Sequence, residues 1–500
     1  MVVLAAAARA RAAMPCGPAD DPCIVQASIT LDDPAGETIS IGTRALVIAP
    51  GVTVRTVAGP LTLQAGSVTL APGARIVSAG KVYGQDVTIA ASPGDIRIQA
   101  DATGAATIDL SGPVQGGALQ MTADGDIVVD GTLVGRSGKV GYGGIIQLTS
   151  VHGNVALNGI RPVDISSGTL GTGGLLAVAA QAGGIVVNGR LDVAGGDGGI
   201  LRLTAATTVV STVAGRLVVN STGSGGSGGE VDIQGQSGVS LAGLIDGRGH
   251  VGGYGSGDGA YVSLAGDTIL LAGTLNLAGA SPDGRGGTLD VTGGDITTTG
   301  RILAAGKGIY GCGGDVRMQM SRAVVLGGTD VSGGSCGGGT VTVRSAGAVT
   351  LVGAIAADGR RAYGYAGTID VQADEVVVSS TVNADARLGS GLIVLHGCSL
   401  TVQPGAQLTT LGAYGRNVLQ SNGEMTIAGP VVSGGGSCSA GATQYNPCTR
   451  DADCQAPGLC VETGQNTFAY ADPLRVPVVS APVSPATVPV LTALGPCTGP

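Results

Sequence analysis

The stretch Gly339-Thr-Val-Thr-Val-Arg-Ser-Ala-Gly-Ala-Val-Thr-Leu-Val-Gly-Ala-Ile-Ala-Ala357 contains three short runs in which apolar and polar residues alternate, with glycine between the runs. Alternation with a period of two buries one face of a β-strand, and runs this short do not form helices. The inward residues of this unit are predicted to be Val341, Val343, Val349, Leu351, Ile355 and Ala357. The unit that begins at Gly367 matches them one by one, with Ile369, Val371, Val376, Val378, Val382 and Ala384. The sequence therefore predicts a repeat with three strands per unit.

A glycine pair or cluster begins each unit, and the starts recur every 24 to 30 residues by subtraction, about 27 on average. The starts are Gly117, Gly144, Gly174, Gly199, Gly229, Gly259, Gly287, Gly314, Gly339, Gly367 and Gly391. Equivalent strands of neighbouring units would pair about 4.8 Å apart, so that each unit bonds only to the units before and after it. We therefore predict an all-β fold, a right-handed parallel β-helix of about fifteen three-strand coils over residues 38–435, which gives a rod of roughly 70 Å.

Other architectures with many short strands compete with this prediction. An antiparallel β-sandwich and a propeller also use glycine-bounded strands, but a propeller blade typically needs about 40 residues. Collagen would need glycine at every third position. The shorter period and the three runs per unit favour the solenoid.

The repeated Gly-Gly-x-apolar-x-apolar units resemble the glycine-rich β-helix proteins of bacterial surfaces, including filamentous-haemagglutinin-like adhesins. The resemblance covers about residues 38 to 435. It implies an exported, non-catalytic structural or adhesive protein of the cell surface or extracellular matrix, with a surface glycan or another protein as its partner.

Composition limits the classes of partner. The chain has 92 glycines, no tryptophan, a formal net charge of −9 and only 12% charged residues. Without a basic stripe, nucleic acid is an unfavourable partner, and an anionic membrane surface is disfavoured for the same reason. No window approaches the roughly 20 apolar residues that span a bilayer, so no transmembrane segment is expected.

The two ends differ from the repeat. Residues 1–15 are read either as a truncated signal peptide or as an ordinary chain end, and residues 16–37 as a cap with a cysteine pair. Residues 436–470 are predicted to form a cysteine-rich tail module, similar to short modules of secreted bacterial proteins. The proline density of residues 471–500 favours an extended linker. Open ends of a β-helix expose unpaired strand edges, so end-to-end or lateral self-association is a further expectation.

Ten cysteines, an even number, suit disulfides in an oxidising compartment, which favours secretion. Cys312 and Cys336 occupy one repeat column in successive coils, within disulfide reach, so a bond between them is predicted. Cys16 and Cys23 are expected to close a small loop, whereas Cys398 and Cys497 have no obvious partner. The tail cysteines fit disulfides better than a zinc site, because zinc ligands usually pair two to four residues apart; these are Cys438, Cys448, Cys454 and Cys460. No metal or cofactor is expected.

The alternative function is a β-helix polysaccharide lyase or glycoside hydrolase. The outward column of the first strand reads Arg202, Asp232, Ser263, Asp290, Arg317, Thr342 and Asp370. Asp232 and Asp290 would lie two coils apart, about 10 Å, which exceeds the usual separations of about 5 to 9.5 Å between glycosidase carboxylates. We therefore predict a solvated ladder and no catalytic residues.

Tyrosines are the remaining candidates for binding. A chain without tryptophan can offer sugar rings only tyrosine platforms. The corners of nearby coils hold the candidates Tyr254, Tyr261, Tyr310, Tyr363 and Tyr365. The glycine-rich insert over residues 249–257 is expected to protrude at a corner as a variable binding surface.

Overall fold

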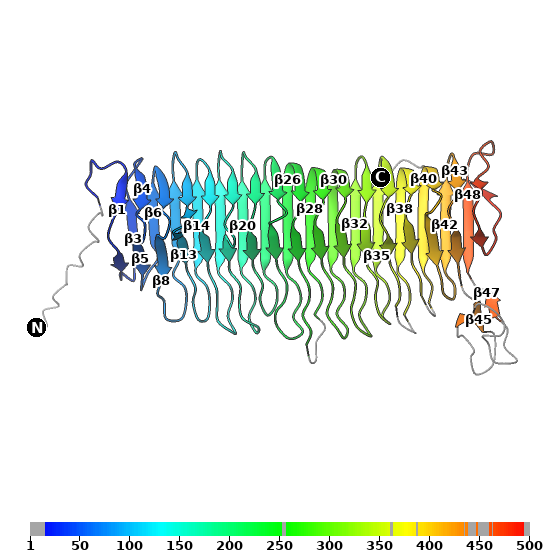
Figure 1. The fold of residues 1–500 in the computed structure, drawn as a ribbon, viewed down its shortest axis with the longest axis horizontal. Helices are drawn as coiled ribbons and strands as arrows, with labels where there is room; N and C mark the ends of the chain where they lie inside the picture. Colours follow the sequence, from blue (N-terminus) through cyan, green and yellow to red (C-terminus); the bar gives the residue numbers. More distant parts are fainter. Residues whose placement is uncertain are drawn as a thin grey trace, which may run out of the picture.

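The computed structural model describes residues 16–252, 257–360, 364–386, 389–434 and 464–494, and the backbone of 436–438, 447–448 and 460–462. Every regular element in these parts of the chain is a β-strand. The strands form a parallel β-solenoid of about 15 turns, drawn in Figure 1 as a long rod. The predicted all-β solenoid of three-strand coils is confirmed.

The first face of the rod is a ladder of parallel strands in register from coil to coil. Its strands are β3 (Glu37–Ser40), β6 (Leu61–Ala65), β9 (Val87–Ala91), β14 (Ala118–Ala123), β17 (Ile145–Ser150), β20 (Leu175–Ala180), β23 (Ile200–Ala205), β26 (Glu230–Leu241), β28 (Tyr261–Leu271), β30 (Thr288–Thr298), β32 (Asp315–Met320), β35 (Thr340–Ser345), β38 (Thr368–Val378), β40 (Leu392–Val402), β42 (Arg416–Ser421), β48 (Gln465–Tyr470) and β51 (Val490–Leu491). Five of them, β26, β28, β30, β38 and β40, continue round the first corner onto the second face, because their second halves pair with second-face strands or with one another.

The second and third faces complete each coil. The second face consists of those second halves and of β1 (Cys23–Val25), β4 (Ala45–Ile48), β7 (Ser67–Leu70), β10 (Ile96–Ile98), β15 (Ile127–Val129), β18 (Val155–Leu157), β21 (Ile185–Val187), β24 (Thr208–Ser211), β33 (Val324–Leu326), β36 (Ala348–Leu351), β43 (Met425–Ile427) and β49 (Val478–Val479). The third face consists of β2 (Ile29–Leu31), β5 (Thr53–Thr56), β8 (Arg75–Ser78), β13 (Thr107–Asp109), β16 (Thr132–Val134), β19 (Val163–Asp164), β22 (Arg190–Asp192), β25 (Arg216–Val218), β27 (Leu244–Asp246), β29 (Thr274–Asn276), β31 (Arg301–Leu303), β34 (Gly328–Asp330), β37 (Ile355–Ala356), β39 (Thr381–Asn383), β41 (Gln407–Thr410), β44 (Val431–Ser433) and β50 (Val483–Ser484). A small antiparallel pair, β11 (Ala100–Asp101) and β12 (Gly104–Ala105), lies in one corner.

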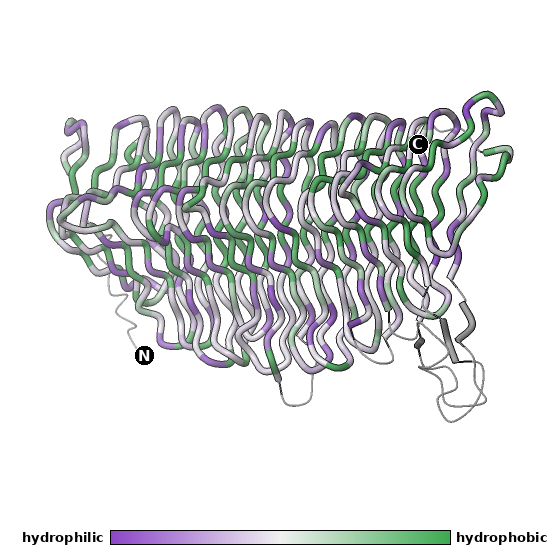
Figure 2. Tube along the Cα trace, turned by 45° about the vertical axis from the view of Figure 1, so that its right-hand side comes forward, coloured by the Kyte–Doolittle hydropathy of each residue, from purple (hydrophilic) through white to green (hydrophobic). Residues whose placement is uncertain are grey.

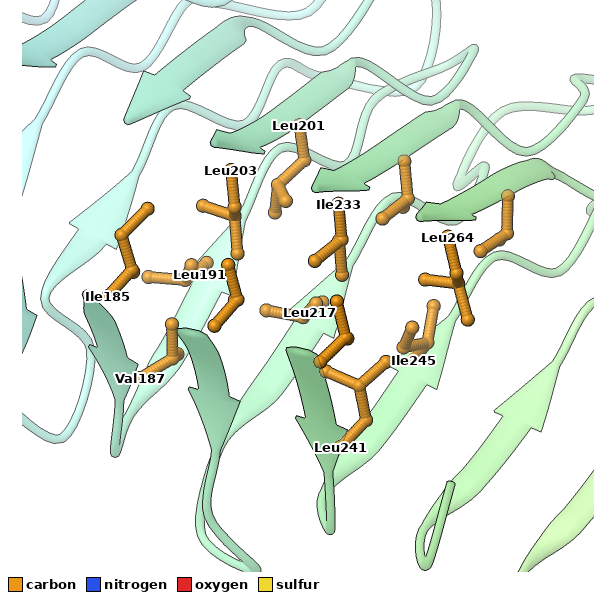
Figure 3. Packing of buried hydrophobic residues seen from close by; sticks show 14 of the residues in the cluster. Ile185, Val187, Leu191, Leu201, Leu203, Leu217, Ile233, Leu241, Ile245 and Leu264 are labelled. Carbon is orange, nitrogen blue, oxygen red and sulfur yellow. The ribbon is translucent and has the colours of Figure 1, made fainter. Parts of the chain in front are cut away.

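The lumen is filled by stacks of aliphatic side chains, as the alternation predicts. Leu203, Ile233 and Leu264 are in register on adjacent coils and form one stack (Figure 3). The hydropathy colouring shows the same apolar stretches recurring from coil to coil (Figure 2). All twelve inward residues predicted for the units at Gly339 and Gly367 are fully buried. A fully buried aliphatic side chain contributes about 1.5–3 kcal/mol, so these stacks provide the main stabilisation.

The glycines that begin the units are required by close stacking. Gly339 directly precedes β35, and a Cβ on it would lie 1.8 Å from the carbonyl oxygen of Gly314 in the preceding coil. A Cβ on Gly367 would lie 1.8 Å from the oxygen of Gly339. Neither position has a positive φ. The close approach of neighbouring coils, and not a positive φ, therefore requires glycine at these two corners.

The long loops all follow the third face and project from one edge of the rod (Figure 1). They are layered on one another by backbone hydrogen bonds, such as Gly196 N–H to Gly168 O (3.0 Å) and Gly223 N–H to Gly196 O (3.2 Å). In the predicted binding insert, His250 N–H donates to Gly226 O (3.1 Å) and Ala280 N–H donates to Gly257 O (2.8 Å). The insert is therefore anchored at both sides to neighbouring coils.

The strands after residue 464 pair with strands of the rod. β48 pairs with β42, and residues of the expected linker form β49, β50 and β51, which pair with β43, β44 and β48. Within residues 471–500, where an extended linker was expected, these three short strands add to the ladders of the rod. The tail backbone forms antiparallel strands β45 (Gly436–Cys438), β46 (Pro447–Cys448) and β47 (Cys460–Glu462).

Two predicted disulfides are present. Cys16 is bonded to Cys23, and Cys312 is bonded to Cys336 with a Cα–Cα distance of 4.9 Å. Cys312 pairs in register with Gly337, so the second bond joins successive coils. The side chains of the four tail cysteines lie outside the described residues. The two bonds indicate folding in an oxidising compartment.

Candidate functional site

The outward column of the first face is aligned as predicted. Arg202, Asp232, Ser263, Asp290, Arg317, Thr342 and Asp370 follow one another in register on β23, β26, β28, β30, β32, β35 and β38. We call these seven residues the polar column. The alternating strands point every second side chain outward, which places the column on a flat sheet surface.

Hydrogen bonds and ion pairs satisfy the charges of the polar column. Asp290 accepts a hydrogen bond from Tyr261 Oη at 2.9 Å and lies 3.5 Å from an Arg317 nitrogen. Asp232 accepts from the side-chain amide of Gln234 at 3.1 Å. Arg344, two residues along β35 from Thr342, forms an ion pair with Asp370. These acids act as acceptors in a surface network.

Tyr261, a predicted binding residue, belongs to this network. Partial burial raises the pKa of its phenol, and the hydrogen bond to Asp290 and the negative charges of Asp290, Asp232 and Glu230 raise it further. The phenol is therefore held neutral as a donor. A ligand would therefore have to compete with Asp290 for the hydroxyl of Tyr261.

The polar column does not bring two carboxylates to catalytic spacing. Asp232 and Asp290 are separated in register by Ser263, which corresponds to about 10 Å. Arg317 lies between Asp290 and Asp315, contacting the latter at 3.3 Å.

Two hollows indent the described surface. A shallow hollow of about 330 Å³ lies on the first face, where Ala177 and Ala179 leave space between Gln147, Thr149 and Arg202. A larger hollow of about 840 Å³ lies at the first coil and is lined in part by Val25, Leu31 and Ile39. The first hollow has polar walls that could take a hydroxylated ligand, and the second has a mixed lining that also includes Asp20, Asp21 and Gln26.

Three of the five predicted tyrosines lie in the described residues, and they belong to different parts of the coil. Tyr310 and Tyr365 are exposed in the corner loops, whereas Tyr261 lies at the start of β28 on the sheet. Tyr254 and Tyr363 lie outside the described residues. The loop edge instead holds other exposed tyrosines that the prediction omitted, namely Tyr83, Tyr142 and Tyr414.

A row of ion pairs between buried aspartates and partly exposed arginines lies beside the third face and was not predicted. Asp164 is completely buried and pairs with Arg136 and with Arg161, which lies 3.1 Å away. Arg161 also contacts Asp192 at 2.5 Å, and Arg190 contacts Asp192 at 2.7 Å. Asp164 and Asp192 point away from the lumen, so the alternation of inward and outward residues predicts that their side chains are exposed. Their burial shows that this side of the third face is covered.

Burial alone would raise the pKa of Asp164. Hydrogen bonds from Arg136 and Ser166, with the positive charges of Arg161 and Arg136, outweigh burial and lower the pKa. The carboxylate therefore remains ionised at neutral pH. A buried acid that is ionised and fully paired fits a structural role, because proton transfer requires a carboxyl group whose pKa lies near the working pH.

Further along the same corner, carboxylates are stacked on successive coils. The Asp385 N–H donates to Asp358 Oδ1 at 3.0 Å, and the Leu411 N–H donates to Asp385 Oδ1 at 2.7 Å. Burial raises the pKa of both acids. Each side chain thus links its own coil to the next one.

Searches for a metal site and a membrane span were negative in the described residues. No group of three or more histidine, cysteine or acidic side chains there could hold a metal ion. No helix long and apolar enough to cross a membrane occurs in that part of the chain.

Comparisons with known proteins return nothing. No family model, no curated protein and no solved structure matches the chain.

Proposed function

We propose that the chain is an exported, non-catalytic rod that serves a structural or adhesive role at a cell surface or in an extracellular matrix. The observation that carries this proposal is the polar column, whose carboxylates are engaged with arginine, tyrosine or amide groups. Glycoside hydrolysis uses one carboxyl group as an acid and a second as a base or nucleophile. The column supplies paired acceptors at a spacing of about 10 Å instead.

The two disulfides support an exported location. Disulfides persist in oxidising environments and are rare in the cytosol. The solenoid supports the mechanical role, because each coil contacts its neighbours alone and the length can grow without a larger core. Broad flat faces then present side chains at regular intervals, which suits contact with an extended partner.

A screen of the secreted protein for polysaccharide binding and depolymerisation tests this proposal. We expect that no polymer in the screen is shortened. The double variant Asp232→Ala/Asp290→Ala should leave the protein folded, since both side chains lie on the surface. Cleavage of a polymer that this variant abolishes would establish the lyase or hydrolase alternative and overturn the proposal.

A further inference from the structure

The loops of four successive coils expose apolar side chains along one stretch of the loop edge. These loops are residues 79–86, 110–117, 135–144 and 165–174. Val140, Tyr142 and Leu170 expose 72%, 62% and 63% of their surfaces. We call the following set the apolar loop patch: Val82, Tyr83, Val114, Val140, Tyr142 and Leu170. Contiguous exposed apolar side chains mark contact sites for proteins or membranes.

Backbone hydrogen bonds fix the patch in place. The Val114 N–H donates to Val82 O at 3.0 Å, and the Tyr142 N–H donates to Val114 O at 3.1 Å. The Leu170 N–H donates to Lys139 O at 2.9 Å, which joins the fourth loop to the third. The patch is therefore ordered before it meets a partner, which lowers the entropic cost of binding.

Positive charge accompanies the apolar side chains. Lys81 precedes Val82, and Lys139 precedes Val140; both lysines are exposed. The four loops contain a single acidic residue, Asp86, which accepts a hydrogen bond from the Ala118 N–H (2.9 Å), although the chain carries a net charge of −9. The third lysine of the chain, Lys307, lies in another loop of the same corner and precedes Ile309 and Tyr310. All the lysines of this acidic protein thus lie beside exposed aliphatic and tyrosine side chains.

We propose that the apolar loop patch docks on an anionic lipid surface. Tyrosine concentrates at membrane–water interfaces, where its ring is apolar and its hydroxyl stays hydrated. Lysine reaches the headgroups while its stem covers apolar surface. Valine and leucine enter the boundary between headgroups and acyl chains. The patch offers these three kinds of side chain on one rigid edge, with the rod lying along the membrane.

The chemistry favours lipid over a polysaccharide. Val82, Val140 and Leu170 offer a sugar neither a hydrogen bond nor an aromatic platform, whereas acyl chains accept them. The net charge disfavours an anionic surface for the protein as a whole. The charges next to a patch determine its attraction to lipid, however, because interactions between exposed charges are screened beyond about 8–10 Å at physiological salt.

Sedimentation of the full chain with lipid vesicles tests this inference. We expect binding to vesicles that contain phosphatidylglycerol, weaker binding to pure phosphatidylcholine, and loss of binding at high salt. Each lysine near an anionic bilayer strengthens partition about fivefold, so Lys81→Gln/Lys139→Gln should weaken it at least tenfold. Val140→Ser/Tyr142→Ser should weaken binding to both kinds of vesicle. Matched controls are Val213→Ser, which is 83% exposed at a different corner, and Arg301→Gln on the third face; both should bind as the parent does.

Three results would overturn the inference: equal binding by the lysine variant and the parent, equal losses in the controls, or retention on an acidic polysaccharide such as alginate with no binding to vesicles. The inference rests on the proposed surface role only for its biological setting. Polymer cleavage would remove that role and leave vesicle binding unchanged, so the two proposals can fail separately.

Discussion

At the scale of single residues, Asp330 and Asp358 lie on neighbouring coils and have opposite pKa shifts. Burial would raise the pKa of Asp330, but hydrogen bonds from Ser332 and Arg360 outweigh burial and lower it. Burial raises the pKa of Asp358 and outweighs the hydrogen bond from the Asp385 N–H, which lowers it; the charges of Asp385 and Asp330 raise the pKa further, and Arg360 opposes them. The same corner therefore contains one carboxylate that favours the ionised form and one that resists it.

Replacement of each acid by asparagine should change stability in opposite directions at pH 7. Asp330→Asn loses the ion pair with Arg360 and should destabilise the protein by about 1 kcal/mol. Asp358→Asn keeps an acceptor for the Asp385 N–H, removes a half-buried charge and should stabilise by about 0.5 kcal/mol. Urea denaturation followed by circular dichroism measures both changes.

The stability contributions of Asp330 and Asp358 depend on pH in opposite directions. The folded pKa of Asp330 is depressed, so its contribution is present above the unfolded pKa of about 3.9 and is lost as pH falls through the folded pKa. The folded pKa of Asp358 is raised, so its contribution is full below about pH 3.9 and is lost as pH rises through the folded pKa. Both variants should approach the parent as the pH is lowered to 3 and below. A change of the same sign for both variants at pH 7 would contradict the assigned shifts.

At the scale of the elements, the tight corner before each first-face strand depends on glycine. Gly339→Ala would place a Cβ 1.8 Å from Gly314 O, so the two coils must separate and their ladder must distort. We expect a loss of at least about 2 kcal/mol, in the range of overpacked sites. Gly328, on β34, is the matched control, because its nearest atom would lie 4.0 Å away. Gly328→Ala should be neutral or stabilise by about 0.5 kcal/mol through the unfolded state.

Hydrogen exchange of the backbone amides in β32 and β35 measures the local stability of the two glycine variants. Faster exchange is expected there for Gly339→Ala and not for Gly328→Ala. Similar exchange in the two variants would show that coil spacing tolerates a side chain at the unit start, contrary to the packing described above.

The residues that face the lumen and the columns that follow the repeat could be predicted from the sequence, whereas the burial of some outward residues could not. Alternation identifies Val341 and Val343 because burial in a strand has a period of two. Cys312 and Cys336 could be paired because the repeat fixes their column. Asp164 sits at an outward position, and its burial follows from long-range packing that leaves no periodic signal. The apolar loop patch does have a sequence pattern by which it could have been predicted, since each lysine precedes an aliphatic residue and a tyrosine.

At the scale of the whole molecule, the coils are approximately independent modules. Contacts are made between neighbouring coils, so stability is roughly a sum of coil terms and nearest-neighbour terms. The registers Leu175↔Ile200 and Ile200↔Glu230 show that residues 200–229 form one complete coil. Removal of this coil would bring β20 against β26 in the register that β23 now occupies. Leu176 and Val178 would then stack on Val231 and Ile233.

Deletion of residues 200–229 should therefore leave a folded solenoid that is shorter by about 5 Å. The deleted coil contains no member of the buried Arg136, Asp164, Arg161 and Asp192 cluster, so the deletion strands no buried charge. Deletion of residues 200–215 alone should unfold the neighbouring coils, because a third-face strand would follow directly where a first-face strand is needed and every inward residue would lose its stack. Small-angle scattering gives the rod length and cross-section, and circular dichroism reports the strand content. A full-coil deletion that unfolds as completely as the half-coil deletion would show that the rod folds as one cooperative unit rather than as stacked modules.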